Sequence, residues 1–336
     1  MKTSSPPLEQ EKLTPLSAVK ITELSDPTSV GESVQAIAQD VVKLSSSPLK
    51  ARRVEVRLGD FLILFHSTNL PVRTRTSLHE GFVAFTAFGP DSFGTVNGLP
   101  LGADQILASV PGIEIELIVA AGYESVAFLL PPDMIRDHVA RRQLEDEFNI
   151  PHNITLLTPC SSRASELYQW GRRLIDIAIR QPDVFDFPQV QSAGQAELLE
   201  KLLATVGSAR HIEPSQHDLT QQAHSRVVQI AENYALSHTA ERIHVTDLCE
   251  AAGVSERTLQ YAFKELLGMT PMAYLTRLRL HRARQTLQVA THASTTVANE
   301  ALRWGFWHFG DFSRAYKECF GELPSDTLRR QSGEGN

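Results

Sequence analysis

Residues 245–267 read VTDLCEAAGVSERTLQYAFKELL, and this stretch decides how the C-terminal part of the chain folds. It predicts two short helices joined by a tight turn. Gly253 supplies the turn, because a residue without a Cβ atom reaches positive φ at little cost. Ser255 stands where it can cap the second helix by accepting a backbone N–H. The stretch therefore predicts a helix-turn-helix unit.

The second helix of this unit has one apolar and one polar face. Leu259, Phe263 and Leu266 recur at spacings of four and three, which is a buried stripe of a helix. The opposite face carries side chains that are mostly polar: Glu256, Arg257, Gln260, Tyr261 and Lys264. A helix with such a face, held by a helix-turn pair, has the shape that enters a DNA major groove.

The same pattern returns further along the chain, which is an internal repeat. Six positions pair at one offset: Leu259 with Phe312, Phe263 with Tyr316, Leu267 with Phe320, Gly268 with Gly321, Pro271 with Pro324 and Leu275 with Leu328. The second unit covers residues 296–320, with Gly305 in its turn. Two such units can contact successive major-groove segments roughly 34 Å apart on one face of the DNA.

The outer face of the second unit is also expected to contact DNA. Its candidate residues are His308, Phe309, Ser313, Arg314 and Lys317. Arg314 is the side chain best suited to a guanine edge, and Lys317 is better suited to a phosphate. For His308, a surface or capping role is an equal alternative.

A long helix over residues 271–288 is predicted between the two units, starting at the Thr270 cap with Pro271 in the first position. Its length of roughly 27 Å is about the separation of neighbouring major-groove segments. It carries a group of basic residues: Arg277, Arg279, Arg282 and Arg284. We expect at least one of them to contact a phosphate, and the alternative is a solvated face with local ion pairs.

Composition gives the general class of protein. A chain of 336 residues with 42% hydrophobic residues is long enough for about two domains. No run of 18 apolar residues and no secretory signal is visible, and the three cysteines are few and far apart. These features favour a cytoplasmic protein. Cys249 and Cys319 fit small core residues better than nucleophiles.

The N-terminal half predicts a separate β-rich domain. Five short runs rich in β-branched and aromatic residues occur at 54–67, 79–89, 105–112, 113–122 and 125–131. They suggest a small barrel or sandwich, with a cupin-like jelly roll as the preferred fold. Amphipathic helices are expected at 31–43, 133–147, 161–180 and 195–206. The last two could form a dimer contact or simply cover the barrel.

The expected organisation is thus an α+β protein of two domains. Residues 1–30 form a loose tail, 31–207 an effector-sensing or dimerisation domain, 208–220 a linker and 221–330 an all-α DNA-binding domain. The net charge of −7 divides unevenly, since residues 1–218 carry roughly −8 and residues 219–336 roughly +1. Because binding to phosphates depends on local basic groups, the acidic half argues only that this half does not touch DNA.

Two segments carry a family resemblance. AAGVSERTLQYAFKELLGMTPMAYLTRLRLHRAR at 251–284 and GFWHFGDFSRAYKECFGELPSDTLR at 305–329 resemble the AraC/XylS family of transcription regulators. The WGFWHFGDF segment and the barrel region are further similar to the ethanolamine-utilisation regulator within that family. The chain departs from the family at Leu323, where a threonine usually precedes the proline.

The resemblance implies a seven-helix DNA-binding domain and an N-terminal domain that binds an effector or a second protomer. It implies base contacts from Arg257, Gln260, Tyr261, His308, Phe309, Ser313 and Arg314. Tyr261 and Phe309 are poor hydrogen-bonding readers, so apolar contact to a thymine methyl group is expected there. The expected partners are promoter DNA, RNA polymerase, a small-molecule effector and a second copy of the chain. An activator is favoured over a repressor, and an ethanolamine-like effector is one candidate.

Two other functions compete with this interpretation. A cupin-like metal enzyme would need three converging ligands, and His66, His79 and Glu80 do not complete such a set. No catalytic residue, metal or cofactor is therefore expected. A DNA-binding dimer without an effector stays open as the second alternative.

Overall fold

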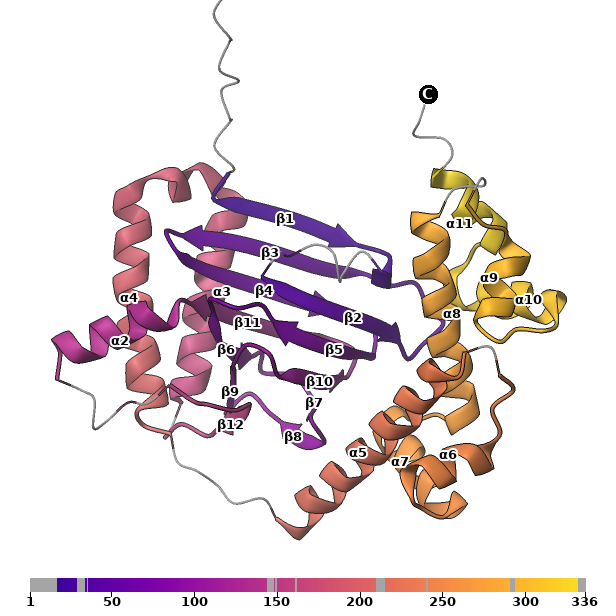
Figure 1. The fold of residues 1–336 in the computed structure, drawn as a ribbon. Helices are drawn as coiled ribbons and strands as arrows, with labels where there is room; N and C mark the ends of the chain where they lie inside the picture. The colour runs from indigo at the N-terminus through magenta and orange to yellow at the C-terminus, as the bar shows by residue number, and fades with distance from the viewer. Residues whose placement is uncertain are drawn as a thin grey trace, which may run out of the picture.

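The computed structural model describes residues 17–28, 34, 36–143, 148, 150–160, 162–209, 215–239, 241–290 and 294–331. It contains a β-rich N-terminal domain and a helical C-terminal domain that lie side by side (Figure 1). The predicted α+β class with these two parts is therefore confirmed. Every helix in the described ranges is too short or too polar to traverse a lipid bilayer.

The N-terminal domain is built from two antiparallel sheets that enclose apolar side chains. The large sheet has the order β1-β3-β4-β11-β6-β9-β12 and the small sheet the order β2-β5-β10-β7-β8. The strands of the large sheet are β1 (Val19–Leu24), β3 (Ala51–Leu58), β4 (Phe61–Thr68), β6 (Val83–Phe88), β9 (Ile106–Ser109), β11 (Tyr123–Leu130) and β12 (Thr155–Leu157). Those of the small sheet are β2 (Ile37–Lys43), β5 (Val72–Leu78), β7 (Gly94–Val96), β8 (Leu99–Leu101) and β10 (Glu114–Val119).

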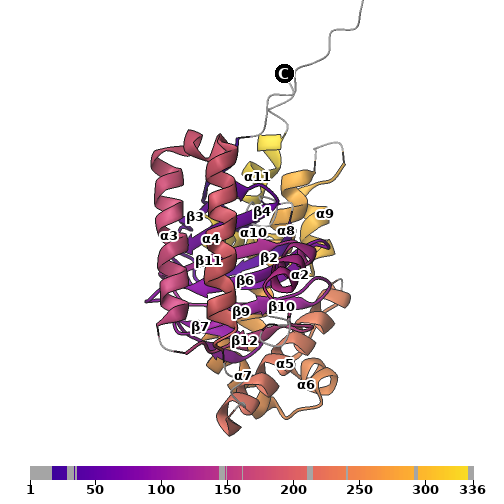
Figure 2. The same ribbon diagram turned by 90° about the vertical axis from the view of Figure 1, so that its left-hand side faces the viewer.

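Helices cover the outer face of the large sheet (Figure 2). They are α2 (Pro132–Arg141), α3 (Arg163–Arg180), the 3-10 helix η1 (Pro182–Asp186) and α4 (Pro188–Val206). Trp170 and Leu202 join one apolar cluster with strand residues such as Phe128. A Cβ on Gly171 would lie 2.8 Å from the Phe128 ring, so glycine lets α3 approach the sheet closely. The apolar faces of α3 and α4 pack against this sheet, which supports the alternative in which the two helices cover the β-rich domain.

Two N-terminal expectations were wrong in the described residues, and a third differs in where its helix ends. Residues 19–24 of the expected tail form β1, which pairs with β3 from Val19↔Val56 to Leu24↔Ala51. Residues 37–43, expected in a helix, form β2, because alternate side chains there face the sheet interior and the C-terminal domain. Helix α2 ends at Arg141, and residues 144–147 of its expected extent lie outside the described residues.

The C-terminal domain is entirely helical. Its helices are α5 (Gln216–Ser237), α6 (Val245–Ala252), α7 (Glu256–Leu267), α8 (Pro271–Val289), α9 (Val297–Arg303), α10 (Phe309–Phe320) and α11 (Pro324–Gln331). Helix α8 connects two apolar clusters, with Leu275 in the cluster of α6 and α7 and Leu287 in the cluster of α9 and α10. Each helix-turn-helix unit therefore packs in a separate apolar cluster on a shared helix, and Val42 and Ile118 of the small sheet join the first cluster.

The start of α5 corrects the expected linker. Ser215 and Asp218 form a reciprocal capping box, so the helix begins at Gln216 and residues 216–220 are helical. Residues 210–214 of the expected linker lie outside the described residues.

Candidate nucleic-acid interface

The first helix-turn-helix unit is held by the residues that the sequence indicated. Gly253 has φ +65°, and Val254 N–H donates to the Cys249 carbonyl at 3.1 Å, which closes the end of α6. Ser255 Oγ accepts from Thr258 N–H at 3.2 Å and caps α7. Leu259 and Phe263 are fully buried. The position of α7 is thus determined by its own core and caps.

The outer face of α7 is open to solvent. Glu256, Arg257 and Lys264 are exposed and Gln260 is half-buried. Tyr261 is 59% exposed, with one edge against the His224 ring of α5 at 5.4 Å between ring centroids. All five predicted side chains therefore lie on or beside one accessible surface.

The N-cap of α7 gives a direct stability test. Replacing Ser255 with alanine leaves the Thr258 N–H without its acceptor and should lower the free energy of unfolding by about 1 kcal/mol. Ser255→Asp keeps a capping oxygen and should remain close to the parent protein. Urea unfolding of both variants checks this, and equal losses would contradict the capping role.

The second unit repeats this construction with one difference. Gly305 has φ +78°, and an added Cβ there would lie 2.7 Å from the Thr239 carbonyl oxygen, so both conformation and space require glycine. Phe306 N–H donates to the Ala301 carbonyl at 2.8 Å. His308 is the N-cap of α10 but its side chain makes no capping hydrogen bond. The structure therefore contradicts only the capping part of the alternative for His308, since its side chain is exposed.

The outer face of α10 carries the remaining candidates. Phe309 and Lys317 are exposed, Ser313 is half-buried, and the Arg314 side chain is 80% exposed with Asp311 3.4 Å away. Trp307, which the sequence reasoning did not single out, is 55% exposed beside them. The sequence feature that could have indicated an exposed ring here is the high density of aromatic residues in WGFWHFGDF, because so many rings cannot all fit in one core.

The arginines of α8 are arranged differently from the expectation. Three of them bond to the N-terminal domain: Arg277 to the Lys43 carbonyl and Ser46, Arg282 to Asp40, and Arg284 to Asp26. Arg279 donates to the His238 carbonyl. Arg284 is only 5% exposed, because the N-terminal domain and α11 cover it. In this arrangement Arg284 is not available to a phosphate.

Comparisons with known proteins agree with this geometry. Residues 248–330 match the sequence model of a helix-turn-helix domain family. Over 132 residues the chain is 34% identical to XylDLEGF operon transcriptional activator 2 of Pseudomonas putida, an alignment that covers 39% of this chain and 78% of that protein. The chain belongs to the AraC/XylS family of transcription regulators.

Two further matches each cover about a third of the chain. The chain is 41% identical over 103 residues to the probable thc operon regulatory protein of Rhodococcus erythropolis, which is 31% of each chain. A crystal structure of a probable AraC family transcriptional regulator from Rhodopseudomonas palustris CGA009 is 36% identical, covers 31% of this chain and 95% of that chain, and gives a TM-score of 0.28. The chain thus spans about a third of the length of the Rhodococcus relative. Neither is the ethanolamine-utilisation regulator.

In this member of the family a buried polar cluster joins the two domains. We call Arg73, Glu116, Ser225, Glu232 and Tyr274 the interdomain cluster. Arg73 of β5 forms ion pairs with Glu116 of β10 and with Glu232 of α5. Arg73 also donates to the Tyr274 hydroxyl at 2.7 Å, and this hydroxyl donates to Glu232 at 2.8 Å. Ser225 donates to Glu116 at 2.7 Å.

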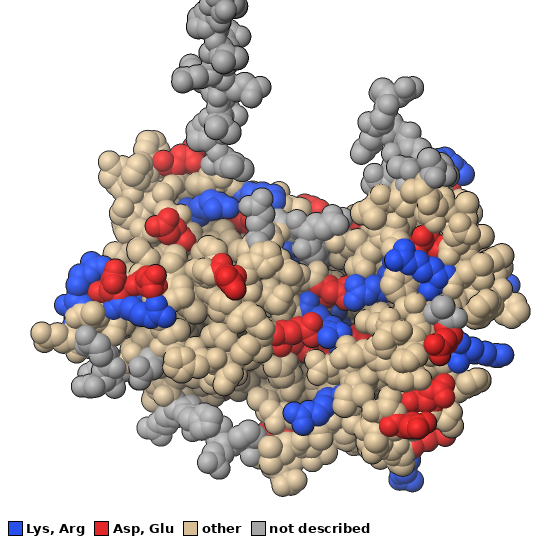
Figure 3. Space-filling model, viewed as in Figure 1, with Lys and Arg blue, Asp and Glu red and all other residues tan. Residues whose placement is uncertain are grey.

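The interdomain cluster is enclosed, since each of its members is at most 6% exposed. Burial opposes ionisation of Glu232, but the Arg73 charge and its hydrogen bond hold the pKa of Glu232 below the ordinary value. Burial opposes the charge of Arg73, but Tyr274, Glu232 and Glu116 together raise the pKa of Arg73 well above its ordinary range. Figure 3 shows charged side chains of both signs where the sheets meet the helical domain.

The small sheet is a wall shared by the two domains. Along β5, alternate side chains face a cavity between the sheets (Val72, Thr74, Thr76 and Leu78). The residues between them point the other way, where Arg73 contacts α5 and α8 and Arg75 contacts Asn233 of α5. Because side chains alternate along a strand, one strand touches both the interior of one domain and the surface of the other.

A second contact joins the N-terminal domain to the second unit. Lys43 at the end of β2 donates through Nζ to the carbonyl of Cys319 at 2.8 Å, in the last turn of α10. The Lys43 backbone N–H donates to His281 Nε2 of α8 at 3.3 Å. Burial, with the nearby charges of Lys43 and Arg277, lowers the pKa of His281 to about 3. Asp26 acts in the opposite direction but does not outweigh these effects, so the buried imidazole is neutral.

This histidine predicts an acid sensitivity. Its pKa is lower in the folded chain than in the unfolded one, so below about pH 6.5 only the unfolded chain takes up the proton. Stability should therefore fall as the pH is lowered. Between pH 7 and pH 5 this single group contributes about 2 kcal/mol of that loss. His281→Gln, which can still accept from Lys43, should show a loss smaller by about this amount in urea titrations.

The matched control is His152→Gln, because His152 is exposed. It should follow the parent protein at both pH values. Parallel pH profiles for the parent and His281→Gln would contradict the assignment of a neutral buried imidazole.

Proposed function

We propose that the chain is a sequence-specific DNA-binding regulator that activates transcription, with α7 and α10 in successive major-groove segments. The observation that carries this proposal is the repeated unit, in which two helices with exposed polar faces are packed on α8. The name of the Pseudomonas relative as a transcriptional activator supports activation.

We assign the DNA contacts to the exposed faces of α7 and α10. In α7 the DNA contacts are Glu256, Arg257, Gln260, Tyr261 and Lys264, and in α10 they are His308, Phe309, Ser313, Arg314 and Lys317. Arg314 is proposed for base readout and Lys317 for phosphate contact. Arg279 is the best remaining phosphate candidate of α8, since the other three arginines bond to the N-terminal domain.

We further propose that the N-terminal domain, over residues 31–207, senses a small molecule and controls the reach of the two DNA-binding units. The interdomain cluster and the Lys43 contact support a direct route, because the sensing domain touches α5, α8 and α10. A change at residues 208–220 is a second route. A dimer without an effector is the alternative, and contact with RNA polymerase is a further proposal. An ethanolamine-like effector is a candidate that rests on the sequence resemblance alone.

Binding of the full-length protein to DNA from its own upstream region tests the main proposal. Affinity should fall steeply as salt rises, while a large excess over random competitor DNA remains at every salt concentration. Binding equal to that of competitor DNA at all salt concentrations, with and without a panel of small molecules, would reject sequence-specific regulation.

A further inference from the structure

A cavity of about 110 Å³ lies between the two sheets of the N-terminal domain. It is somewhat smaller than the engineered cavity of about 150 Å³ that holds benzene in another protein. A compact molecule of about five to seven non-hydrogen atoms would fill it. Strands of both sheets contribute its walls, so such a molecule would touch the small sheet and, through it, the surface that holds the DNA-binding domain.

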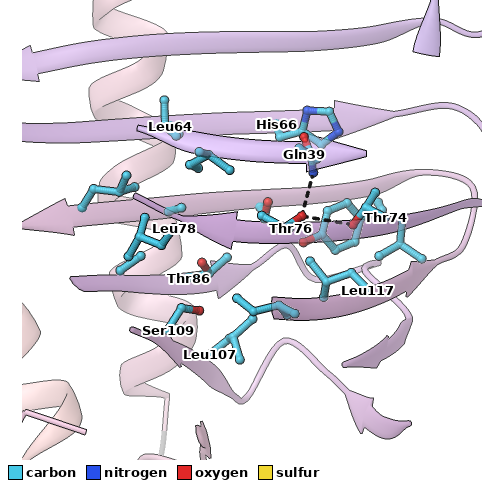
Figure 4. Close-up of a pocket in the computed structure, with 18 of the residues that line it drawn as sticks. Gln39, Leu64, His66, Thr74, Thr76, Leu78, Thr86, Leu107, Ser109 and Leu117 are labelled. Carbon is cyan, nitrogen blue, oxygen red and sulfur yellow. Dashed lines mark hydrogen bonds between the residues drawn. The ribbon is translucent and has the colours of Figure 1, made fainter. Parts of the chain in front are cut away.

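His66 and Gln39 lie toward one end of the cavity, and Leu64 and Leu78 lie toward the other (Figure 4). Leu64, Leu78 and Leu129 belong to an apolar group that spans both sheets. The other end is polar because β3 and β4 place Arg53 opposite His66 in their register, and Arg53 donates to Gln39 across the cavity at 2.8 Å. A ligand that matches this lining has an apolar body and one polar head.

His66 is a polar residue of this lining with a buried side-chain nitrogen, Nδ1, that has no hydrogen-bond partner among the described residues. Unpartnered buried polar atoms cost free energy and are rare in folded proteins, so a retained one indicates a role outside folding. A ligand head at this ring would supply the missing hydrogen bond.

The charges around His66 decide which head fits. Burial and the charge of Arg53 lower the pKa of His66 to about 3, so the imidazole is neutral and one of its nitrogens is a donor. Gln39 uses its oxygen for Arg53 and its Nε2 for Thr76 at 3.3 Å, which leaves its amide oriented by the protein. The Arg53 charge disfavours a cationic ligand and favours an oxygen acceptor.

We propose that this cavity binds a compact apolar molecule carrying one hydrogen-bond-accepting oxygen, with the oxygen at His66 and the body among the leucines. The inference rests on the proposed sensing role of the N-terminal domain and specifies the ligand class for it. It argues against an ammonium compound such as ethanolamine, whose charge would meet Arg53 and whose body is too polar for the leucine end.

A matched set of probes tests the class. Cyclopentanone, cyclopentylamine and methylcyclopentane share one ring and differ in the head, which is an acceptor, an ammonium group or a methyl group. Titrated into the full-length protein without DNA, cyclopentanone should raise the melting temperature and bind at least tenfold more tightly than the other two. Equal binding of methylcyclopentane, tighter binding of the amine, or no binding of the ketone would overturn the proposal.

His66→Leu separates ligand recognition from folding. Because the variant removes an unpartnered polar atom, its melting temperature should equal or exceed that of the parent protein, while the tenfold preference for the ketone over the hydrocarbon is lost. His152→Leu, at an exposed position, should keep that preference. A preference that survives in His66→Leu would overturn the role of this ring, and if the variant does not fold, the probe series on the parent protein decides.

DNA binding is measured in parallel on the same samples. If the parent protein binds its DNA specifically but does not bind the ketone, this inference alone is overturned. Ketone binding without any specific DNA binding would instead reject the proposed regulatory function and leave the cavity site standing.

Discussion

Arg73→Ala is expected to release the DNA-binding domain from the N-terminal domain and to lower the free energy of unfolding by about 3–5 kcal/mol. The variant leaves the carboxylates of Glu116 and Glu232 buried without their shared cation. The Tyr274 hydroxyl loses the donor at 2.7 Å as well. An uncompensated buried charge is costly, so the domains should separate and admit water before either core unfolds.

Two measurements check this expectation. Urea unfolding gives the stability loss, and small-angle scattering should show a larger radius of gyration as the domains separate. The matched control is Arg52→Ala, because the Arg52–Glu23 pair is exposed and should contribute less than about 1 kcal/mol. Equal losses in the two variants, or an unchanged radius for Arg73→Ala, would contradict the interdomain role.

The functional consequence of Arg73→Ala is also specific. If the interdomain cluster transmits the effector response, DNA binding by the variant should no longer change when a ligand is added. The helix-turn-helix cores do not include Arg73, so specific DNA binding itself should persist.

Arg314→Ala should weaken specific DNA binding by about 1–3 kcal/mol, which is roughly a fivefold to 150-fold loss in affinity. The reason is its position on the exposed face of α10, where the side chain is 80% exposed and held only by an exposed contact to Asp311. Binding to random competitor DNA should change little, because phosphate contacts carry that part of the affinity. Competition assays with the upstream DNA measure both the specific and the non-specific affinity.

Arg136→Ala supplies the control for Arg314→Ala. Arg136 forms the same kind of exposed pair, with Asp133 three residues before it, but lies on α2 of the sensing domain. It should bind DNA like the parent protein. Lys317→Ala should instead weaken binding to specific and random DNA alike and reduce the salt slope by about one. An Arg314→Ala loss that is equal on both DNAs would reject base readout.

The repeated unit could be predicted because its determinants are local. Turn glycines, caps and apolar spacings act within a few residues, so Gly253, Ser255 and the stripe of α7 appear in the structure where the sequence indicated. The covering role of α3 and α4 was one of two alternatives, since an amphipathic face does not reveal which apolar surface it will meet.

The same logic explains the misses. Strand β5 reads VRTRTSL and lies outside the five predicted β-rich runs, because its polar residues conceal a strand that is buried on both faces. In the structure Arg73 is 1% exposed, because the second domain covers the outer face of the small sheet. Arg284 was assigned to a basic helix surface, yet Asp26 and Glu322 enclose it. Both errors come from treating each domain as if water surrounded it.

By itself the sequence determined the two helix-turn-helix units, their shared helix and the polar faces that we propose to contact DNA, since these depend on short-range spacing. Only the tertiary structure decided which charges are buried between the domains and which side chains line the cavity. Arg73 pairs with Glu232, which is 159 residues away in the sequence, and the cavity beside His66 is lined by strands from both sheets. Such pairings depend on long-range packing, which a local pattern does not contain.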